Sequence, residues 1–316
     1  MIKHVGNERL MVKVCNLYYI EDLKQEEIAK KLGISRPTIS RLLKDAKQAG
    51  IVRIEIVSPF ENDYSELEKS IEMKYGLKNV IVANDQADDL SQKKELAKEA
   101  ALYLQRILKP KDVVGLSMGT TLREIPQYVT GRKDSKITFV PLLGGVGQAN
   151  IEIHPNQIVM EIANAFGGQY MLLHAPAVVS DPNIIKTFSQ ELGIKRVMEM
   201  MEKVNVAVVG LGTPFDENST MMATGYYDHE DIELMKQKKA VGDICMQSYN
   251  AEGESKEFDS NKKVFGFPIE KLRNIETVVA VAGGLSKLEA IKGAIRGGYI
   301  NVLITNYSNA LELDRE

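Results

Sequence analysis

The chain has 316 residues, of which 44% are hydrophobic and 26% are charged, and its formal net charge is −3. This composition is typical of a globular protein and excludes a disordered chain, while the length favours two domains over one. Two cysteines are too few for a disulfide framework, no apolar run approaches the roughly 20 residues of a membrane helix, and the N-terminus lacks a signal peptide, so we expect a cytoplasmic protein.

The charge is unevenly distributed along the chain. Residues 1–53 carry eleven Lys and Arg against six Asp and Glu, a balance of +5, which leaves −8 for the remainder. A basic N-terminal part on an acidic body is typical of a protein that binds a polyanion through one domain. A solvated helical surface would give the same pattern, so the charge alone does not decide between them.

The N-terminal part has the pattern of a helix-turn-helix. Residues 9–20 and 24–32 place apolar side chains at helical spacing. Gly33 can adopt a left-handed turn, Ser35 is a good N-cap, and Pro37 suits the first turn of a following helix. Four residues of that last helix are predicted to face the core: Ile39, Leu42, Leu43 and Ala46.

The outward face of the last helix carries short polar and basic side chains, as expected of a helix that enters a DNA major groove. The residues that we predict to contact operator DNA are Gln25, Ser35, Arg36, Pro37, Thr38, Ser40, Arg41 and Lys44. An ordinary helical hairpin with a charged face is the alternative. Residues 51–57 alternate like a strand and predict a winged form, so we place the DNA-binding domain at 1–57 and a second domain at 58–316.

The second domain alternates short apolar runs with helical patterns, which predicts parallel strands covered by helices on both faces, a doubly wound α/β domain. An amphipathic helix over 62–75 precedes it and is a candidate element for assembly. The predicted strands are 79–84, 112–117, 137–143, 169–176, 204–210, 277–283 and 301–305. The predicted helices are 91–108, 120–129, 155–166, 183–202, 229–238 and 286–296.

Five loops rich in glycine and hydroxyl groups accompany these strands, at 115–121, 141–148, 210–213, 241–243 and 282–287. Glycine lets backbone N–H groups approach an anion, and ligands of such sheets bind at the carboxyl ends of the strands. Plain turn chemistry is the alternative for each loop taken singly. Lys287 is a candidate to bind a phosphate through its positive charge, and an ordinary surface lysine is the alternative. Asp243 is a candidate to accept hydrogen bonds from sugar hydroxyl groups, and a helix cap or turn anchor is the alternative.

Several other kinds of site are disfavoured. The loops contain no Walker motif and no strict G-x-G-x-x-G, so nucleotide binding is not expected. The loop with Leu142 and Leu143 has no lysine that could form an imine with a sugar aldehyde. The four histidines are scattered without metal spacing.

Taken together, the segment 17–56, "GLSMGTT", "PLLGG", "GLGT", "AVGDIC" and "AGGLSKLEAIKGAIRGGYINVLITN" resemble the SorC family of bacterial sugar-binding transcriptional regulators over nearly the full length. The resemblance implies an effector domain similar to sugar-phosphate isomerases and deaminases, which binds a phosphorylated sugar. It implies a homodimer or homotetramer with operator DNA as partner. We expect no catalytic residue, metal or cofactor. The implied effector contacts are Ser117, Gly119, Thr120, Thr121, Gly144, Gly145, Gly212, Thr213, Asp243 and Lys287. The alternative is a sugar-phosphate isomerase with an accessory DNA-binding head, for which Asp243 is the obvious candidate base.

Overall fold

The computed structural model describes residues 5–54, 63–131, 135–147, 153–215 and 219–315. The chain divides into two compact units, residues 1–61 and 62–316, which are described separately. The predicted domain boundary after residue 57 lies outside the described residues. Among the helices of the described ranges, none has the length and apolar character needed to cross a membrane.

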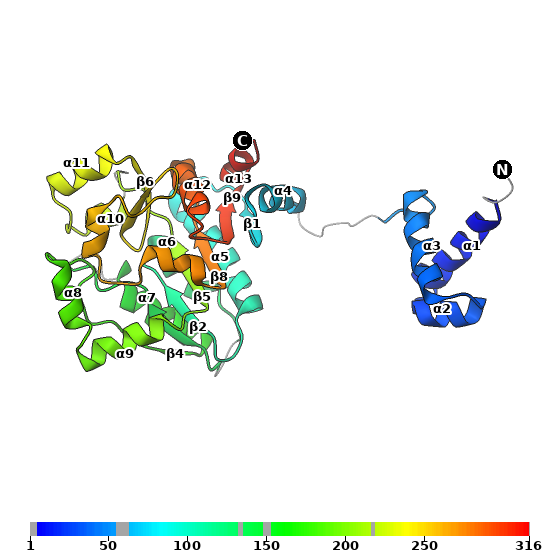
Figure 1. Cartoon of the computed structure of the whole chain (residues 1–316), viewed down its shortest axis with the longest axis horizontal. Helices are drawn as coiled ribbons and strands as arrows, with labels where there is room; N and C mark the ends of the chain where they lie inside the picture. The colour runs from blue at the N-terminus through cyan, green and yellow to red at the C-terminus, as the bar shows by residue number, and fades with distance from the viewer. Residues whose placement is uncertain (1–4, 55–62, 132–134, 148–152, 216–218, 316) are drawn as a thin grey trace. The chain divides into compact units, whose positions relative to one another are not determined.

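The N-terminal unit consists of three α-helices around a small core (Figure 1). They are α1 (Val5–Cys15), which a π-helical turn, η1 (Asn16–Ile20), extends, α2 (Gln25–Leu32) and α3 (Arg36–Gln48). Gly33 has a left-handed φ of 68° and ends α2, as the sequence predicts. The four predicted core residues of α3 are all buried, which confirms the predicted inward face of this helix.

The predicted wing is not formed in the part of it that the structure describes. Residues 51–54 form a bend followed by irregular backbone instead of a strand. The reason is local, because the amides of Ile51 and Val52 both donate to the carbonyl oxygen of Ala46 and so turn the chain back onto α3. Residues 55–57 of the predicted strand lie outside the described residues.

The C-terminal unit is built on a seven-stranded sheet of order β1-β9-β8-β5-β2-β3-β4, and every recorded pairing in it is parallel. The strands are β1 (Asn79–Ala83), β2 (Val113–Leu116), β3 (Thr138–Pro141), β4 (Gln169–Tyr170), β5 (Val206–Gly210), β8 (Thr277–Val281) and β9 (Val302–Asn306). The predicted parallel α/β sheet is thereby confirmed. The predicted strand 169–176 is much shorter in the structure, because only its first two residues pair with β3.

Helices cover both faces of this sheet, and the alternating residues of each strand contribute to two separate cores. On β8, Val278 and Ala280 lie in one core, and Val279 and Val281 lie in the other. The first core is covered by α4 (Ser65–Tyr75), α9 (Leu192–Met201), α12 (Leu288–Arg296) and α13 (Tyr307–Arg315). The second is covered by α5 (Asp89–Ile107), α6 (Thr120–Glu124), the 3-10 turn η2 (Ile125–Tyr128) and α7 (Pro155–Phe166).

Shorter elements complete the unit, and they include two departures from the predicted pattern. Further elements of the described residues are α8 (Pro182–Phe188), α10 (Thr220–Ala223), α11 (His229–Gln237), β6 (Ala240–Ile244), β7 (Gln247–Asn250), η4 (Asp259–Lys263), η5 (Ile269–Asn274) and η6 (Leu285–Lys287). The predicted helix 183–202 is two helices, α8 and α9, and the Ser189 hydroxyl between them donates to the Ile185 carbonyl, a bond that competes with helix continuation.

The second departure is at 241–243, which the sequence predicts to be a loop. These residues belong to β6, which pairs antiparallel with β7 in a separate two-stranded sheet. The turn between the two strands is formed by Cys245 and Met246, whose φ values are 51° and 62°. Two-residue hairpin turns of this kind normally carry Asn or Gly, so the sequence contains no turn signal here.

Candidate effector site and DNA-binding surface

Seven of the eight predicted DNA-contacting residues lie at the N-cap or in the first nine residues of α3, and the eighth, Gln25, is the first residue of α2. Ser35 caps this helix, because its hydroxyl oxygen accepts the Thr38 amide at 3.3 Å and lies 2.8 Å from the Thr38 hydroxyl. Thr38 and Gln25 are half-buried, and the others are exposed: Ser35, Arg36, Pro37, Ser40, Arg41 and Lys44. The N-terminal part of α3 and its N-cap therefore expose three cationic side chains and two hydroxyl groups, those of Arg36, Arg41, Lys44, Ser35 and Ser40.

One of these cations has an acidic neighbour within the unit. The Arg36 guanidinium lies 3.6 Å from the Glu26 carboxylate of α2, and both side chains are exposed. Exposed pairs of this kind contribute little to stability. A phosphate or a base can therefore replace Glu26 as the partner of Arg36 at small cost.

The C-terminal unit contains a cavity of about 910 Å³ at the carboxyl ends of β2, β5 and β8. This is where parallel sheets bind ligands, because helix N-termini and loop amides converge there. Residues from six segments line the cavity: Asp89, Gln92, Lys93 and Leu96; Met118 to Leu122; Gly210 to Gly212; Ser219 and Met221 to Ala223; Asp243, Cys245 and Met246; and Val281 to Gly284, Ser286 and Lys287.

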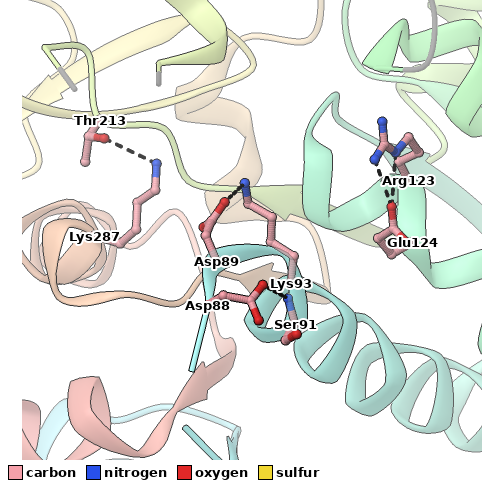
Figure 2. A network of polar contacts seen from close by, with 8 residues as sticks. All are labelled: Asp88, Asp89, Ser91, Lys93, Arg123, Glu124, Thr213 and Lys287. Atoms are coloured by element: carbon pink, nitrogen blue, oxygen red, sulfur yellow. Dashed lines mark hydrogen bonds and ion pairs between the residues drawn. The ribbon is translucent and has the colours of Figure 1, made fainter. Parts of the chain in front are cut away.

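Six of the ten predicted effector contacts line this cavity: Gly119, Thr120, Thr121, Gly212, Asp243 and Lys287. Gly119 has a φ of 150° and forms the turn that leads from β2 into α6. A seventh, Thr213, reaches the same place through its hydroxyl, which lies 3.2 Å from the Lys287 ammonium (Figure 2). The structure thus brings together loops that are far apart in the sequence: Gly119 and Lys287 are separated by 168 positions.

The remaining three predicted contacts have structural roles outside the cavity lining. The buried Ser117 hydroxyl accepts the Gly210 amide and donates to the Met118 carbonyl, so it joins β2 to β5. A Cβ on Gly144 would lie 2.5 Å from two backbone carbonyl oxygens. On Gly145 it would lie 2.5 Å from His154 Nε2. Close packing against neighbouring loops accounts for both glycines without a ligand.

Asp243 is the most unusual group in the cavity. Its side chain is buried, Oδ2 accepts the Met246 amide at 3.3 Å, and Oδ1 has no hydrogen-bond partner among the described residues. Burial raises the pKa of this carboxyl to about 6, although Lys287 and the Met246 amide act in the opposite direction. A buried oxygen without a partner is costly and is expected to accept a hydrogen bond from a ligand hydroxyl.

Gly212 makes room for this carboxylate. The backbones of Gly212 and Asp243 exchange two hydrogen bonds, of 2.9 and 3.1 Å. A Cβ on Gly212 would lie 1.9 Å from Asp243 Oδ1. Glycine is therefore required at position 212 because the Asp243 carboxylate occupies the space of a Cβ atom. The sequence suggests a different reason, a direct contact of the backbone with an anion.

Sequence reasoning missed the contribution of α5 and of the methionines. Asp89, Gln92 and Lys93 line the cavity from the first turn and a half of α5. The search for glycine-rich loops passed over them, although α5 follows a strand and its N-terminus was bound to lie at the same sheet edge. Met221, Met222 and Met246 give part of the lining an apolar character for which the sequence holds no local signal.

Comparison with protein families gives the same division into two parts. Residues 59–313 match the family described as "Putative sugar-binding domain", and residues 13–49 match "Sigma-70, region 4". An N-terminal unit with a helix-turn-helix and a C-terminal unit with a sugar-binding domain define the class of DNA-binding transcriptional regulators that respond to a small molecule.

Individual relatives identify the family more closely. The chain is 34% identical to the deoxyribonucleoside regulator of Bacillus subtilis (strain 168) over 97% of each chain, and 32% identical to the sorbitol operon regulator of Klebsiella pneumoniae over 96% of each. The crystal structure of full-length SorC from Klebsiella pneumoniae covers 98% of this chain and 99% of its own, with a TM-score of 0.75 and 31% identity. This chain belongs to the SorC-type family of sugar-binding transcriptional regulators.

Proposed function

We propose that this protein controls a carbohydrate-metabolism operon, binding operator DNA through the start of α3 and a phosphorylated sugar in the cavity of its C-terminal unit. The observation that carries the choice of ligand is the pairing of a cation with a buried acceptor in one cavity. Lys287, with Thr213 beside it, suits a phosphate group, and Asp243 suits the hydroxyl groups of a sugar.

The ligand must also change DNA binding for the protein to act as a regulator. A ligand shifts an equilibrium only by its differential affinity for the two states, and a coupling free energy of about 1 to 3 kcal/mol is typical. Segments far apart in the sequence line the cavity, so a ligand that bridges them favours one arrangement of the loops. We expect this arrangement to have a different affinity for the operator.

A thermal unfolding experiment tests the choice of ligand. The panel consists of sorbitol 6-phosphate, glucose 6-phosphate and 2-deoxyribose 5-phosphate, each with its unphosphorylated sugar as control. A ligand at 100 times its dissociation constant adds about 2.7 kcal/mol to the free energy of unfolding. We expect one phosphate to raise the melting temperature and its free sugar to leave it unchanged. If no phosphate shifts the transition, the proposed ligand class is wrong.

A sugar-phosphate isomerase is the second candidate, favoured by one observation. Asp243 is a buried carboxyl whose pKa is raised to about 6, which is the range of a general base. The relatives are named as regulators, and we propose that this protein likewise has no enzymatic activity and needs no cofactor. Isomerisation of glucose 6-phosphate, the one aldose phosphate of the panel that has a hydroxyl group on C2, would reverse this choice.

We further propose that the protein is a cytoplasmic homodimer or homotetramer. One helix-turn-helix makes few base contacts, and such proteins usually bind two half-sites about one helical turn apart, or multiples of it. Sedimentation velocity of the full chain measures the assembly directly. A monomer at the concentration that saturates operator DNA would contradict this part of the proposal.

Replacing Arg41 with Ala should weaken operator binding about 10- to 100-fold, because Arg41 is exposed on α3 and a base or phosphate contact of Arg contributes about 1 to 3 kcal/mol. Fluorescence anisotropy of labelled operator DNA measures this loss, and sugar-phosphate affinity should not change. Lys13→Ala, an exposed cation on α1, is the matched control. Equal operator affinities of Arg41→Ala and the wild type would show that the start of α3 is not the reading surface.

A further inference from the structure

The cavity contains a second lysine, Lys93, in addition to Lys287. Lys93 belongs to none of the glycine-rich loops. It lines the cavity from α5, together with Asp89, Gln92 and Leu96. Of these four residues, Lys93 alone has a positive charge. Its side chain is 26% exposed, so the side chain is accessible to a ligand without being fully solvated.

The first turns of α5 are held firmly in place. The Asp88 carboxylate caps the helix by accepting the Ser91 amide at 2.9 Å. The Gln92 side chain is buried, accepts the Gln86 amide and donates to the Asn84 carbonyl, so it ties the helix to the chain that leaves β1. The polar atoms of Gln92 are thus engaged by the backbone, while Lys93, the next residue, lines the cavity. The Lys93 side chain extends toward Asp89 (Figure 2).

The recorded partner of Lys93 is replaceable. Its ammonium lies 2.5 Å from Asp89, one helical turn earlier, and the Asp89 side chain is 80% exposed. Exposed ion pairs of this spacing on a helix surface contribute little to stability. An anion that enters the cavity can take the place of Asp89 at Lys93, and the Asp89 carboxylate, which is already mostly exposed, needs no new partner.

The charges of the cavity show why a second cation matters. A phosphate monoester carries a charge of about −1.5 to −2 at pH 7. Lys287 supplies a single positive charge, and part of its field acts on the buried carboxyl of Asp243. We infer that Lys93 is a second phosphate anchor of the effector site, held by Asp89 in the unliganded protein and released to the ligand on binding. This inference rests on the proposed sugar-phosphate function.

The test compares Lys93→Met with Asp89→Asn by isothermal titration calorimetry, using the member of the phosphate panel that stabilises the wild type most. Loss of the Lys93 charge should raise the dissociation constant about 10- to 100-fold, because charged hydrogen bonds are the strong ones. Loss of the Asp89 charge should lower it about twofold, because the competitor of the ligand is gone and an ion pair of this spacing is weak. Lys94→Met, the exposed neighbour on the same helix, should bind like the wild type.

The opposite signs separate ligand binding from helix stability. If the ion pair only stabilised α5, both variants would weaken binding and lower the melting temperature of the unliganded protein together. A dissociation constant of Lys93→Met within twofold of the wild type, or weaker binding by Asp89→Asn, overturns the inference while the proposed function stands. If the wild type binds no phosphate of the panel, the proposed function fails and the inference fails with it.

Discussion

Replacing Lys287 with Met is expected to raise the dissociation constant of the sugar phosphate about 100-fold and to abolish the ligand's effect on operator binding. The Lys287 ammonium lies in the cavity at 3.2 Å from the Thr213 hydroxyl, where a phosphate would accept a charge-assisted hydrogen bond. Such bonds contribute about 1.5 to 3 kcal/mol, and Met preserves the aliphatic length without the charge. Calorimetric titration measures the affinity, and operator anisotropy with and without ligand measures the response.

Two controls show whether the loss is specific. Lys262→Met removes an exposed lysine that forms an ion pair with Asp259 and does not line the cavity. This variant should bind the sugar phosphate and operator DNA like the wild type. In Lys287→Met itself, operator affinity without ligand should be unchanged. Because Lys287 acts to lower the pKa of Asp243, the pKa of this carboxyl should rise further in the variant. If Lys287→Met binds the sugar phosphate as tightly as the wild type, Lys287 does not bind the phosphate group and this part of the proposal is wrong.

The parts of this protein that local sequence pattern determines were predictable. The inward face of α3 follows from helical spacing, and Gly33 from the need for a left-handed turn. The parallel sheet follows from apolar runs that are buried on both faces. Because parallel strands place all their carboxyl ends at one edge, the sequence also predicted that Thr120, Gly212 and Lys287 would meet.

The parts that depend on contacts between distant segments were not predictable. The role of Gly144 depends on the carbonyl oxygens of Ala175 and Pro176, and the role of Gly212 on the carboxylate of Asp243. In each case glycine is required by a group that lies about 30 residues away in sequence, so the residue type alone suggests an anion site equally well. The β6–β7 hairpin was missed because Cys245 and Met246 occupy a turn whose backbone usually requires Gly or Asn.

The buried carboxyl of Asp243 should make stability depend on pH in a direction opposite to most carboxylates. Burial raises its pKa from an ordinary value near 4 to about 6 in the folded protein, so between these values the folded state binds the proton and the unfolded chain does not. Its contribution is therefore fully present below about pH 4 and is lost as the pH rises through about 6. The difference of about two pKa units corresponds to about 3 kcal/mol.

Asp243→Asn isolates this contribution, because Asn has the same shape, remains neutral and can still accept the Met246 amide. We expect the variant and the wild type to be equally stable near pH 3.5 and the variant to be more stable by about 2 to 3 kcal/mol at pH 7.5, measured by urea unfolding. The nearby Cys245, Tyr227 and Tyr249 have pKa values raised by burial, so they stay neutral throughout this range.

An exposed carboxylate provides the matched control for this pH dependence. Lys262 lowers the pKa of Asp259, so Asp259→Asn should lose stability at neutral pH, the opposite sign. A wild type and an Asp243→Asn variant with parallel stability curves from pH 3.5 to 7.5 would mean that this carboxyl is solvated in solution. If instead the variant is more stable at neutral pH and binds sugar phosphate less tightly, the protein retains a destabilising charge because the ligand's hydroxyl groups require it.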